Sequence, residues 1–316
     1  MTESSVADKT ELDKALAADP RALARLLSLV EDGSTQVRSV IKDLLRQTGR
    51  ARIIGLTGAP GVGKSTVTGA LVGAFRAVGA RVAVLAVDPS SPFSGGALLG
   101  DRIRMQEHAV DDQVFIRSMA SRGHLGGLAA STPQAIRVLD AAGFDPVIVE
   151  TVGVGQAEVA IASLADSVAV LLAPGMGDAI QAAKAGILEV ADLFVVNKAD
   201  KPDAQQVVRD LRGMIALASR AEDDWKPPIV TTVAIRNEGI QELVSRLNQH
   251  WTWLNDTGEL KKRRLARVRE ELTALAFVAL RGRLAGGRLD ELAGRVADGT
   301  LDPFQAADEL LAGHAD

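Results

Sequence analysis

The stretch of sequence that decides the fold is Gly58-Ala59-Pro60-Gly61-Val62-Gly63-Lys64-Ser65-Thr66. It lies between an apolar run, residues 52–56, and a run with helical character, residues 65–78. A strand, a glycine-rich loop and a helix form the context in which the pattern G-x-x-x-x-G-K-[ST] binds phosphate. The alternative is a glycine-rich turn that only packs, but such a turn has no need of the Lys-Ser-Thr ending. The sequence therefore predicts a phosphate-binding loop.

The chemistry of this loop predicts a role for each part of it. The glycines allow a tight turn whose backbone N–H groups point at phosphate oxygens, and the helix presents its positive end to the same anion. Lys64 is expected to reach the β- and γ-phosphates, and the Ser65 hydroxyl to ligate Mg²⁺. All nine residues, 58–66, are predicted to bind nucleotide.

A second motif, Asn197-Lys198-Ala199-Asp200, follows the apolar strand 193–196. The Asp200 carboxylate can accept hydrogen bonds from guanine N1–H and from the exocyclic amine, which adenine does not offer in that arrangement. The stem of Lys198 can lie over the base, and Asn197 can brace neighbouring loops. The two motifs together predict a guanine-nucleotide site that binds GTP and GDP.

Composition limits the other classes. The chain has 316 residues, a net charge of −4 and no cysteine. This length can bury a full core, and the charge predicts no nucleic-acid partner. The lack of cysteine excludes disulfides and fits the cytoplasm. No apolar run approaches the ~18 residues that span a bilayer, so we expect no membrane insertion.

The hydrophobic pattern divides the chain into three parts: a helical extension over 1–50, a nucleotide-binding domain over 51–250, and a helical arm over 251–316. The central part alternates apolar strands with helices, which predicts an α/β fold around a mainly parallel sheet. The nucleotide is expected at the carboxyl ends of the strands. The predicted strands are 53–56, 82–87, 114–116, 147–149, 168–172, 193–196 and 229–233.

Both extensions leave alternatives open. A helix is predicted to begin at Asp19-Pro20, and the N-terminal part either binds a partner or packs on the core. A long helix from about residue 260 to 284 carries an apolar stripe, which predicts a homodimer formed by residues after about 255. The basic run 261–264 contacts phosphates or forms a solvated face. We favour the solvated face because Glu270 and Glu271 follow.

The loops after the other strands supply candidate metal ligands and switches. Asp88 ends the second strand and is placed to hold Mg²⁺. The glycine-rich segment 94–102 suits a switch loop in which Asp101 ligates the metal or positions water. Glu150 follows the fourth strand, where ordinary GTPases carry Asp, and the nearest glutamine is displaced, which predicts slow hydrolysis. Gln181 and Lys184 share a helical face and reach the phosphates or a partner, or are ordinary surface residues.

These motifs, in this order, resemble the MeaB/ArgK family of GTPases, which is similar to the methylmalonic aciduria type A protein. The resemblance rests also on Arg122-Gly-His-Leu-Gly-Gly-Leu and Glu150-Thr-Val-Gly-Val-Gly-Gln. It implies a P-loop G domain of the signal-recognition/MinD class with a C-terminal dimerisation arm. It also implies a chaperone that gates adenosylcobalamin loading and protects methylmalonyl-CoA mutase.

The resemblance assigns catalytic roles to Lys64, Asp101, Glu150, Gln181 and Lys184. It places Ser65, Asp88, Asp101 and Glu150 around the metal, and makes Gln181 and Lys184 part of a third switch loop. Val233-Ala234 replaces the Ser-Ala usual in the family, so the backbone of Ala234 and Ile235 would serve the base. Lys184-Ala185 replaces a usual Lys-Lys pair.

Other functions stay open on the sequence. One is a kinase or ATPase accessory of an amino-acid (lysine/arginine/ornithine) transport system, for which no amphipathic basic anchor is found. Another is a nickel-delivery GTPase, although the four histidines are scattered and no metal-binding tract is present. A third is a nucleotide-dependent scaffold with negligible turnover.

Overall fold

The structure is a computed structural model in which the backbone is described for 14–15, 19–32, 42, 44, 48–88, 108, 110–120, 131–151, 161–175, 188–217 and 224–312. The chain forms two compact units, Met1–Arg264 and Leu265–Asp316. Each unit is described by itself.

The first unit is built on a seven-stranded sheet in the order β3-β2-β4-β1-β5-β6-β7, and every strand pair is parallel. All seven predicted strands are present, and the predicted fold class is confirmed. β7 ends two residues earlier than expected. The strands are β1 (Ile53–Gly58), β2 (Val82–Asp88), β3 (Val114–Ala120), β4 (Val147–Thr151), β5 (Ser167–Leu172), β6 (Leu193–Val196) and β7 (Ile229–Thr231).

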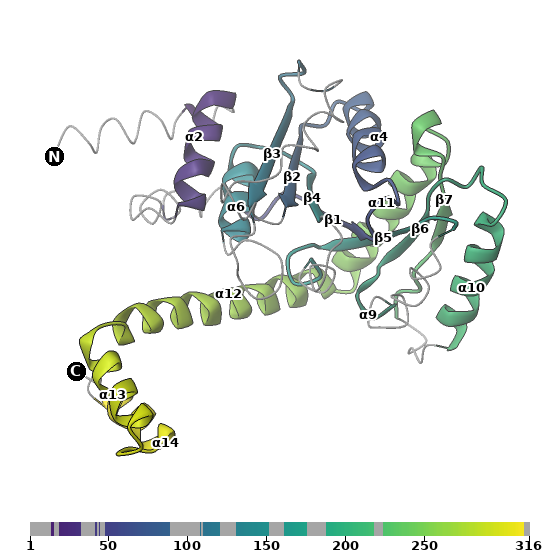
Figure 1. Cartoon of the computed structure of the whole chain (residues 1–316). Coiled ribbons are helices and arrows are strands. Elements are labelled where there is room, and N and C mark those ends of the chain that lie inside the picture. Colours follow the sequence, from purple (N-terminus) through teal and green to yellow (C-terminus); the bar gives the residue numbers. More distant parts are fainter. Residues whose placement is uncertain are drawn as a thin grey trace. The chain divides into compact units, whose positions relative to one another are not determined.

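Helices cover both faces of this sheet (Figure 1). On one face α4 (Lys64–Ala77) and α11 (Ile240–Asp256) pack on side chains such as Ile54 and Leu56. On the other, α2 (Pro20–Glu31) packs on β3, α6 (Thr132–Ala141) on β4, and α10 (Ala204–Leu217) on β6 and β7. Because both faces are covered, the central strands are continuous apolar runs rather than alternating ones.

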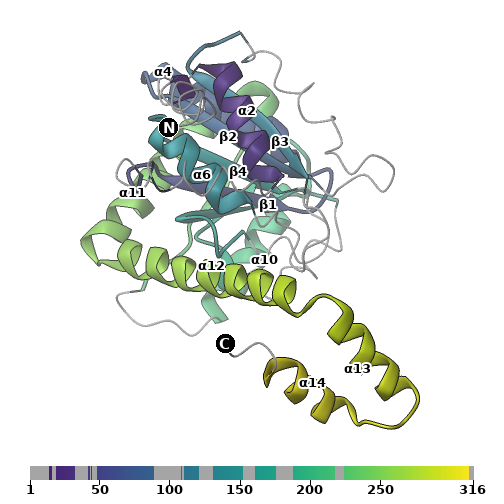
Figure 2. The same cartoon turned by 90° about the vertical axis from the view of Figure 1, so that its left-hand side faces the viewer.

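The N-terminal helix α2 begins where the sequence predicts. The Asp19 carboxylate accepts a hydrogen bond of 2.8 Å from the Ala22 N–H, and Pro20 occupies the first turn. Arg117 of β3 donates to the Ala24 carbonyl at 2.8 Å and pairs with Glu31. α2 lies against α6 in two views (Figure 2). For this segment the packing alternative is correct, whereas most of 33–47 lies outside the described residues.

The long helix α12 (Glu259–Leu284) starts in the first unit and continues into the second, which also holds α13 (Gly287–Ala297) and α14 (Pro303–Ala312). Gly286 separates α12 from α13, and α14 begins at Pro303. Arg288 and Arg295 of α13 both pair with Glu309 of α14. No helix in the described part of the chain is long and apolar enough to cross a membrane.

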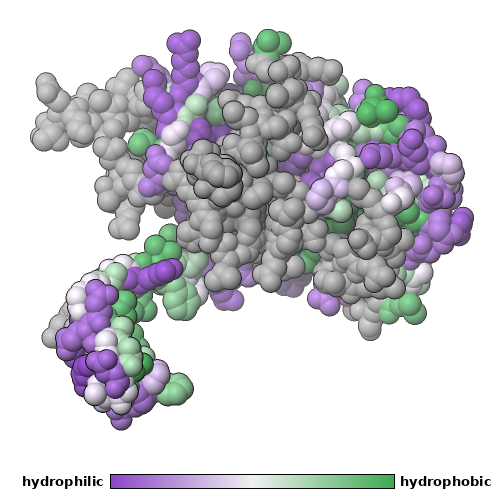
Figure 3. Space-filling view, in the orientation of Figure 1, coloured by the Kyte–Doolittle hydropathy of each residue, from purple (hydrophilic) through white to green (hydrophobic). Residues whose placement is uncertain are grey.

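Apolar side chains gather along the helices of the second unit (Figure 3). α12 buries none of its residues within the chain. Contiguous exposed apolar surface of this kind marks an interaction site. The exposed members are Leu265, Val268, Leu272, Leu275, Phe277, Val278, Leu280, Leu289, Phe304 and Leu311.

Candidate nucleotide-binding site

The loop between β1 and α4 packs closely against Leu171 and Asn197. Gly58 and Gly63 have φ angles of 146° and 96°, a region that side chains rarely adopt. A Cβ at Gly58 would lie 2.3 Å from the Leu171 carbonyl oxygen, and one at Gly63 would lie 2.5 Å from Asn197 Nδ2. Both positions therefore require glycine for conformation and for space.

Lys64, the first residue of α4, folds back over this loop. Its ammonium Nζ donates to the Gly58 carbonyl at 2.8 Å and to the Ala59 carbonyl at 3.1 Å. The residue is buried, so the ammonium is held beside the backbone of the loop. A cation at this place can neutralise a phosphate bound by the loop's N–H groups.

Glu150, at the end of β4, lies beside the same helix. Its buried carboxylate accepts hydrogen bonds of 2.8 Å from the Ser65 hydroxyl and of 2.8 Å from the Thr68 hydroxyl. Leu56 of β1 pairs in register with Glu150, which explains why the loop and the acid meet. Thr68 was not predicted, although its position three residues after Ser65 puts both hydroxyls on one helical face.

These groups suit a magnesium ion chemically, because hydroxyl and carboxylate oxygens are the ligands that Mg²⁺ takes. In the described residues, no group of three acidic or histidine side chains forms a complete ligand set. Asp101 lies outside the described residues, as do Gly153, Gln156, Gln181 and Lys184, and of Asp88 only the backbone is described. The predicted metal and switch residues therefore stay predictions.

Asn197 joins three segments of the site. Its amide Nδ2 donates to the Val62 carbonyl at 2.9 Å. Its Oδ1 accepts from the Thr232 hydroxyl at 3.1 Å and from the Ala234 N–H at 3.2 Å. One buried side chain thus ties the phosphate loop to the predicted base motif and to the segment after β7.

The base motif itself forms a tight turn. Lys198 adopts a φ of 57°, and its Nζ donates to the Gly61 carbonyl at 2.7 Å. The Asp200 side chain is 32% exposed, and one oxygen lies 4.0 Å from Arg236 Nη1, an ion pair that the motif does not predict. Ile235 is exposed, whereas the Ala234 N–H already donates to Asn197 Oδ1.

A cavity of about 620 Å³ adjoins this site. Most of it follows α4 toward Ala77, so it does not coincide with the phosphate loop. It meets the predicted nucleotide-binding residues at Ser65 and Thr66 on one side, and at Ala234 and Ile235 on the other. Its size is within the ~300–1,000 Å³ typical of ligand pockets.

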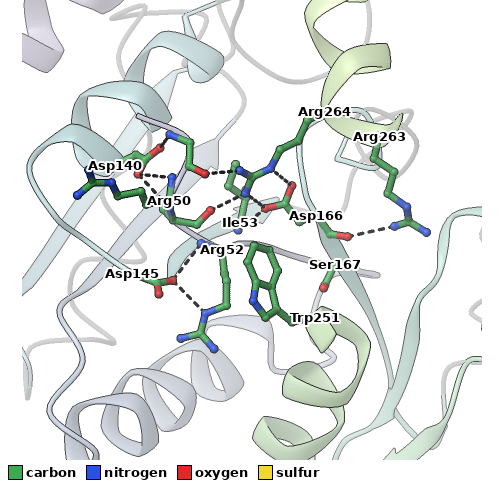
Figure 4. Close-up of polar contacts among 12 residues, drawn as sticks. Arg50, Arg52, Ile53, Asp140, Asp145, Asp166, Ser167, Trp251, Arg263 and Arg264 are labelled. Atoms are coloured by element: carbon green, nitrogen blue, oxygen red, sulfur yellow. Dashed lines mark hydrogen bonds and ion pairs between the residues drawn. The ribbon is translucent and has the colours of Figure 1, made fainter. Parts of the chain in front are cut away.

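At the amino ends of the strands, opposite the phosphate loop, the structure overturns the prediction that the basic run 261–264 forms a solvated face. Arg263 and Arg264 of the basic run neither form a solvated face nor lie at the phosphate loop. Arg264 pairs with the buried Asp166 at 2.8 Å (Figure 4), and Arg263 pairs with Asp192 at 2.9 Å. Lys261 and Lys262 are exposed, as expected. Helical periodicity does not reveal that the buried carboxylates of Asp166 and Asp192 lie at the amino ends of β5 and β6.

Asp192 contacts both a histidine and an arginine at this end of the sheet. Burial disfavours its ionisation, but hydrogen bonds and charges from His250 and Arg263 outweigh burial and lower the pKa of the carboxyl below its usual value. The buried ring of His250 lies 2.7 Å from the Ser167 hydroxyl and 3.3 Å from Asp192. The buried contacts of His250 are structural, which agrees with the lack of a metal-binding histidine tract in the sequence.

A parallel sheet with a Gly-Lys-Ser-Thr loop and an Asn-Lys-x-Asp turn at its carboxyl edge defines the class of P-loop GTPases. The sequence profile of the family described as methylmalonyl-CoA mutase-associated GTPase MeaB matches residues 23–287. The chain belongs to this MeaB family, and it is a GTPase.

Individual proteins similar to this chain have names that agree with this family. A Pyrococcus abyssi protein that carries a GTPase name is 47% identical over 299 residues, 93% of this chain and 92% of the relative. The Caenorhabditis elegans protein named methylmalonic aciduria type A homolog, mitochondrial, is 34% identical over 273 residues, 80% of this chain and 68% of the relative. A solved structure titled LAO/AO transport system kinase superposes with a TM-score of 0.73 at 27% identity, covering 99% of this chain and 98% of that one.

Proposed function

We propose that the chain binds GTP and GDP at the edge formed by the phosphate loop and the Asn197–Asp200 turn, and that it hydrolyses GTP with Mg²⁺. The observation that carries the proposal is the contact of Asn197 with Val62 and Ala234. One side chain thereby fixes the spacing between a phosphate cradle and a base-reading carboxylate. A fixed spacing favours a ligand that has both parts.

In this proposal the residues of the chain divide the work. The backbone of residues 58–66 surrounds the phosphates, and Lys64 neutralises charge on the γ-phosphate. The Ser65 hydroxyl, with Asp88, Asp101 and Glu150 around it, holds Mg²⁺, which supplies further charge neutralisation when bound. Glu150 orients Ser65 through the hydrogen bond described above, and Asp200 accepts from guanine.

Calorimetric titration with GDP and ADP tests the base assignment. GDP should bind more tightly, and Asp200→Ala should cost about 2–4 kcal/mol of GDP affinity because a paired contact is lost. Asp256→Ala, an exposed aspartate at the end of α11, is the matched control and should leave affinity unchanged. Equal affinity of the wild type for GDP and ADP would overturn the assignment.

We further propose that the partner is an adenosylcobalamin-dependent methylmalonyl-CoA mutase, whose cofactor loading the chain gates and which it protects. Membership of the mutase-associated family supports this partner. The partner is expected to speed hydrolysis through Gln181 and Lys184. By linkage, nucleotide should then change mutase affinity by the same factor as mutase changes nucleotide affinity.

The test compares GTP turnover with and without the mutase of the same organism. Wild type should be slow alone and faster with the mutase, whereas Lys184→Ala should bind GDP normally and lose much of the stimulation. Neither stimulation nor a complex in any nucleotide state would exclude this partner. It would favour the second candidate, an accessory of an amino-acid transport system, which the likeness to the LAO/AO transport system kinase supports.

A homodimer formed through α12–α14 completes the proposal. Leu272 and Phe277 are 62% and 66% exposed, which is costly for a helix without a partner. The double variant Leu272→Glu/Phe277→Glu should be monomeric in light scattering and still bind GDP. Glu270→Gln on the same helix should stay dimeric, and a double variant that also stays dimeric would place the interface elsewhere.

A further inference from the structure

The segment that follows β7 forms a hydrogen-bonded hairpin beside the base motif. Val233 and Glu238 exchange backbone hydrogen bonds of 3.0 and 3.3 Å, which closes the hairpin. A Cβ at Gly239 would lie 2.1 Å from the Thr231 carbonyl oxygen, so the end of the hairpin requires a glycine. Arg236 therefore lies within a hairpin that is closed by hydrogen bonds.

This hairpin is fastened to the turn that carries Asp200. The Ala199 N–H donates to the Thr232 carbonyl at 3.0 Å, and the Ala234 N–H donates to Asn197 Oδ1 at 3.2 Å. Two hydrogen bonds thus fix the distance between the hairpin and the Asn197–Asp200 turn. These backbone contacts bring the hairpin and the turn close enough for the side chains of Arg236 and Asp200 to meet.

The guanidinium of Arg236 is itself oriented. Its Nε and Nη2 face Glu238 at 2.8 and 3.4 Å, which leaves Nη1 directed to Asp200 Oδ2 at 4.0 Å. Both carboxylates raise the pKa of this arginine, so it stays charged. No second cation is paired with Asp200 among the residues that the structure describes.

We propose that Arg236 is a positioning residue for guanine recognition, and that its guanidinium holds the Asp200 carboxylate in the orientation that accepts both guanine donors. The inference rests on the proposed function, in which Asp200 reads the base. A carboxylate has about four lone-pair sites, so two can take guanine while another faces Arg236. Exclusion of water by the bound base would strengthen the attraction between the two charges.

Binding of GDP, IDP and ADP to wild type, Arg236→Ala and Arg236→Lys tests the inference. IDP lacks the exocyclic amine, so it needs the orientation of the carboxylate less than GDP does. For a half-exposed ion pair, Arg236→Ala should weaken GDP about 3- to 5-fold and IDP less than about 2-fold. Arg236→Lys, which keeps the charge, should recover part of the loss.

Two controls separate positioning from damage to the hairpin. Arg246→Ala removes an arginine of similar exposure that pairs with Glu242 on α11, and it should change no affinity. Glu238→Ala should weaken GDP less than Arg236→Ala does, and should add nothing to Arg236→Ala, because Glu238 acts through the arginine.

The failures are distinguishable. A wild type without preference for GDP over ADP would overturn the base assignment itself. If the wild type prefers GDP over ADP but Arg236→Ala binds GDP as tightly or more tightly, Arg236 either does not contribute to binding or competes with guanine for Asp200. Equal loss of GDP and IDP would show a structural role alone. Each of these results overturns the positioning role of Arg236.

Discussion

Replacing Asn197 by alanine should destabilise the protein more than any exposed substitution. The change leaves the Val62 carbonyl, the Thr232 hydroxyl and the Ala234 N–H without their amide partner. All three residues are buried. A buried polar group left unsatisfied costs about 1–3 kcal/mol, and water entering the vacated space recovers part of that. We therefore expect a loss of about 3–5 kcal/mol in the free energy of unfolding, against about 5–15 kcal/mol for a whole domain.

Urea unfolding followed by tryptophan fluorescence measures this loss, because Trp225 and Trp253 pack on His250 and Trp251 lies under Arg264, at the amino ends of the strands. Wild type at a GDP concentration of 100 times its Kd should gain about 2.7 kcal/mol, and the variant should gain less because the two halves of the site are no longer tied together. Asn255→Ala, an exposed helical asparagine, should stay within about 0.5 kcal/mol of wild type.

One result would refute this reasoning about Asn197. If Asn197→Ala unfolds within about 1 kcal/mol of wild type, and GDP stabilises both equally, the amide is not a structural link between loop and base motif. A stability loss with an unchanged gain from GDP would confine its role to the fold.

Three further predictions concern Lys64, Arg264 and Asp192. Lys64→Ala should lower GTP turnover at least ~100-fold in a phosphate-release assay, and wild-type release by this variant would place the activity elsewhere. Arg264→Ala leaves Asp166 buried without its cation and should cost about 3–5 kcal/mol in urea unfolding, whereas the exposed Lys261→Ala should cost almost nothing. The pKa of Asp192 in the folded state lies below its ordinary 3.8, so its stabilising contribution is complete above that pH and is lost as pH falls through the folded-state pKa. Acid unfolding of Asp192→Asn should therefore depend less on pH below about 4, and an unchanged acid slope would contradict the assignment.

The sheet could be predicted because its central strands are buried on both faces, which makes β1, β5 and β6 fully buried and mostly apolar. The phosphate loop could be predicted because its spacing is dictated by phosphate geometry. Its two tightest contacts, at Gly58 and Gly63, fall on glycines of the pattern. Local chemistry therefore specified the parts of the fold whose constraints are local.

The missed contacts have partners far away in the sequence. Thr68 reaches Glu150, Arg236 reaches Asp200, and Arg264 reaches Asp166, each across elements that only the folded chain brings together. A helical basic run looks the same whether it is solvated or pairs with buried acids. Composition cannot separate these cases, because the desolvated partner is not on the same helix.

The position of Arg263 and Arg264 sets the place at which the chain can be divided. The compact nucleotide-binding unit ends at Arg264, inside the first two turns of α12. A chain shortened at residue 250 or 255 would lose both arginines and leave Asp166 and Asp192 as buried carboxylates without these cations. A deletion that keeps residues through 264 removes the exposed apolar helices and preserves the amino edge of the sheet. A fusion of this GTPase unit to a different C-terminal arm should therefore be joined after Arg264, within helix α12, and not in a loop.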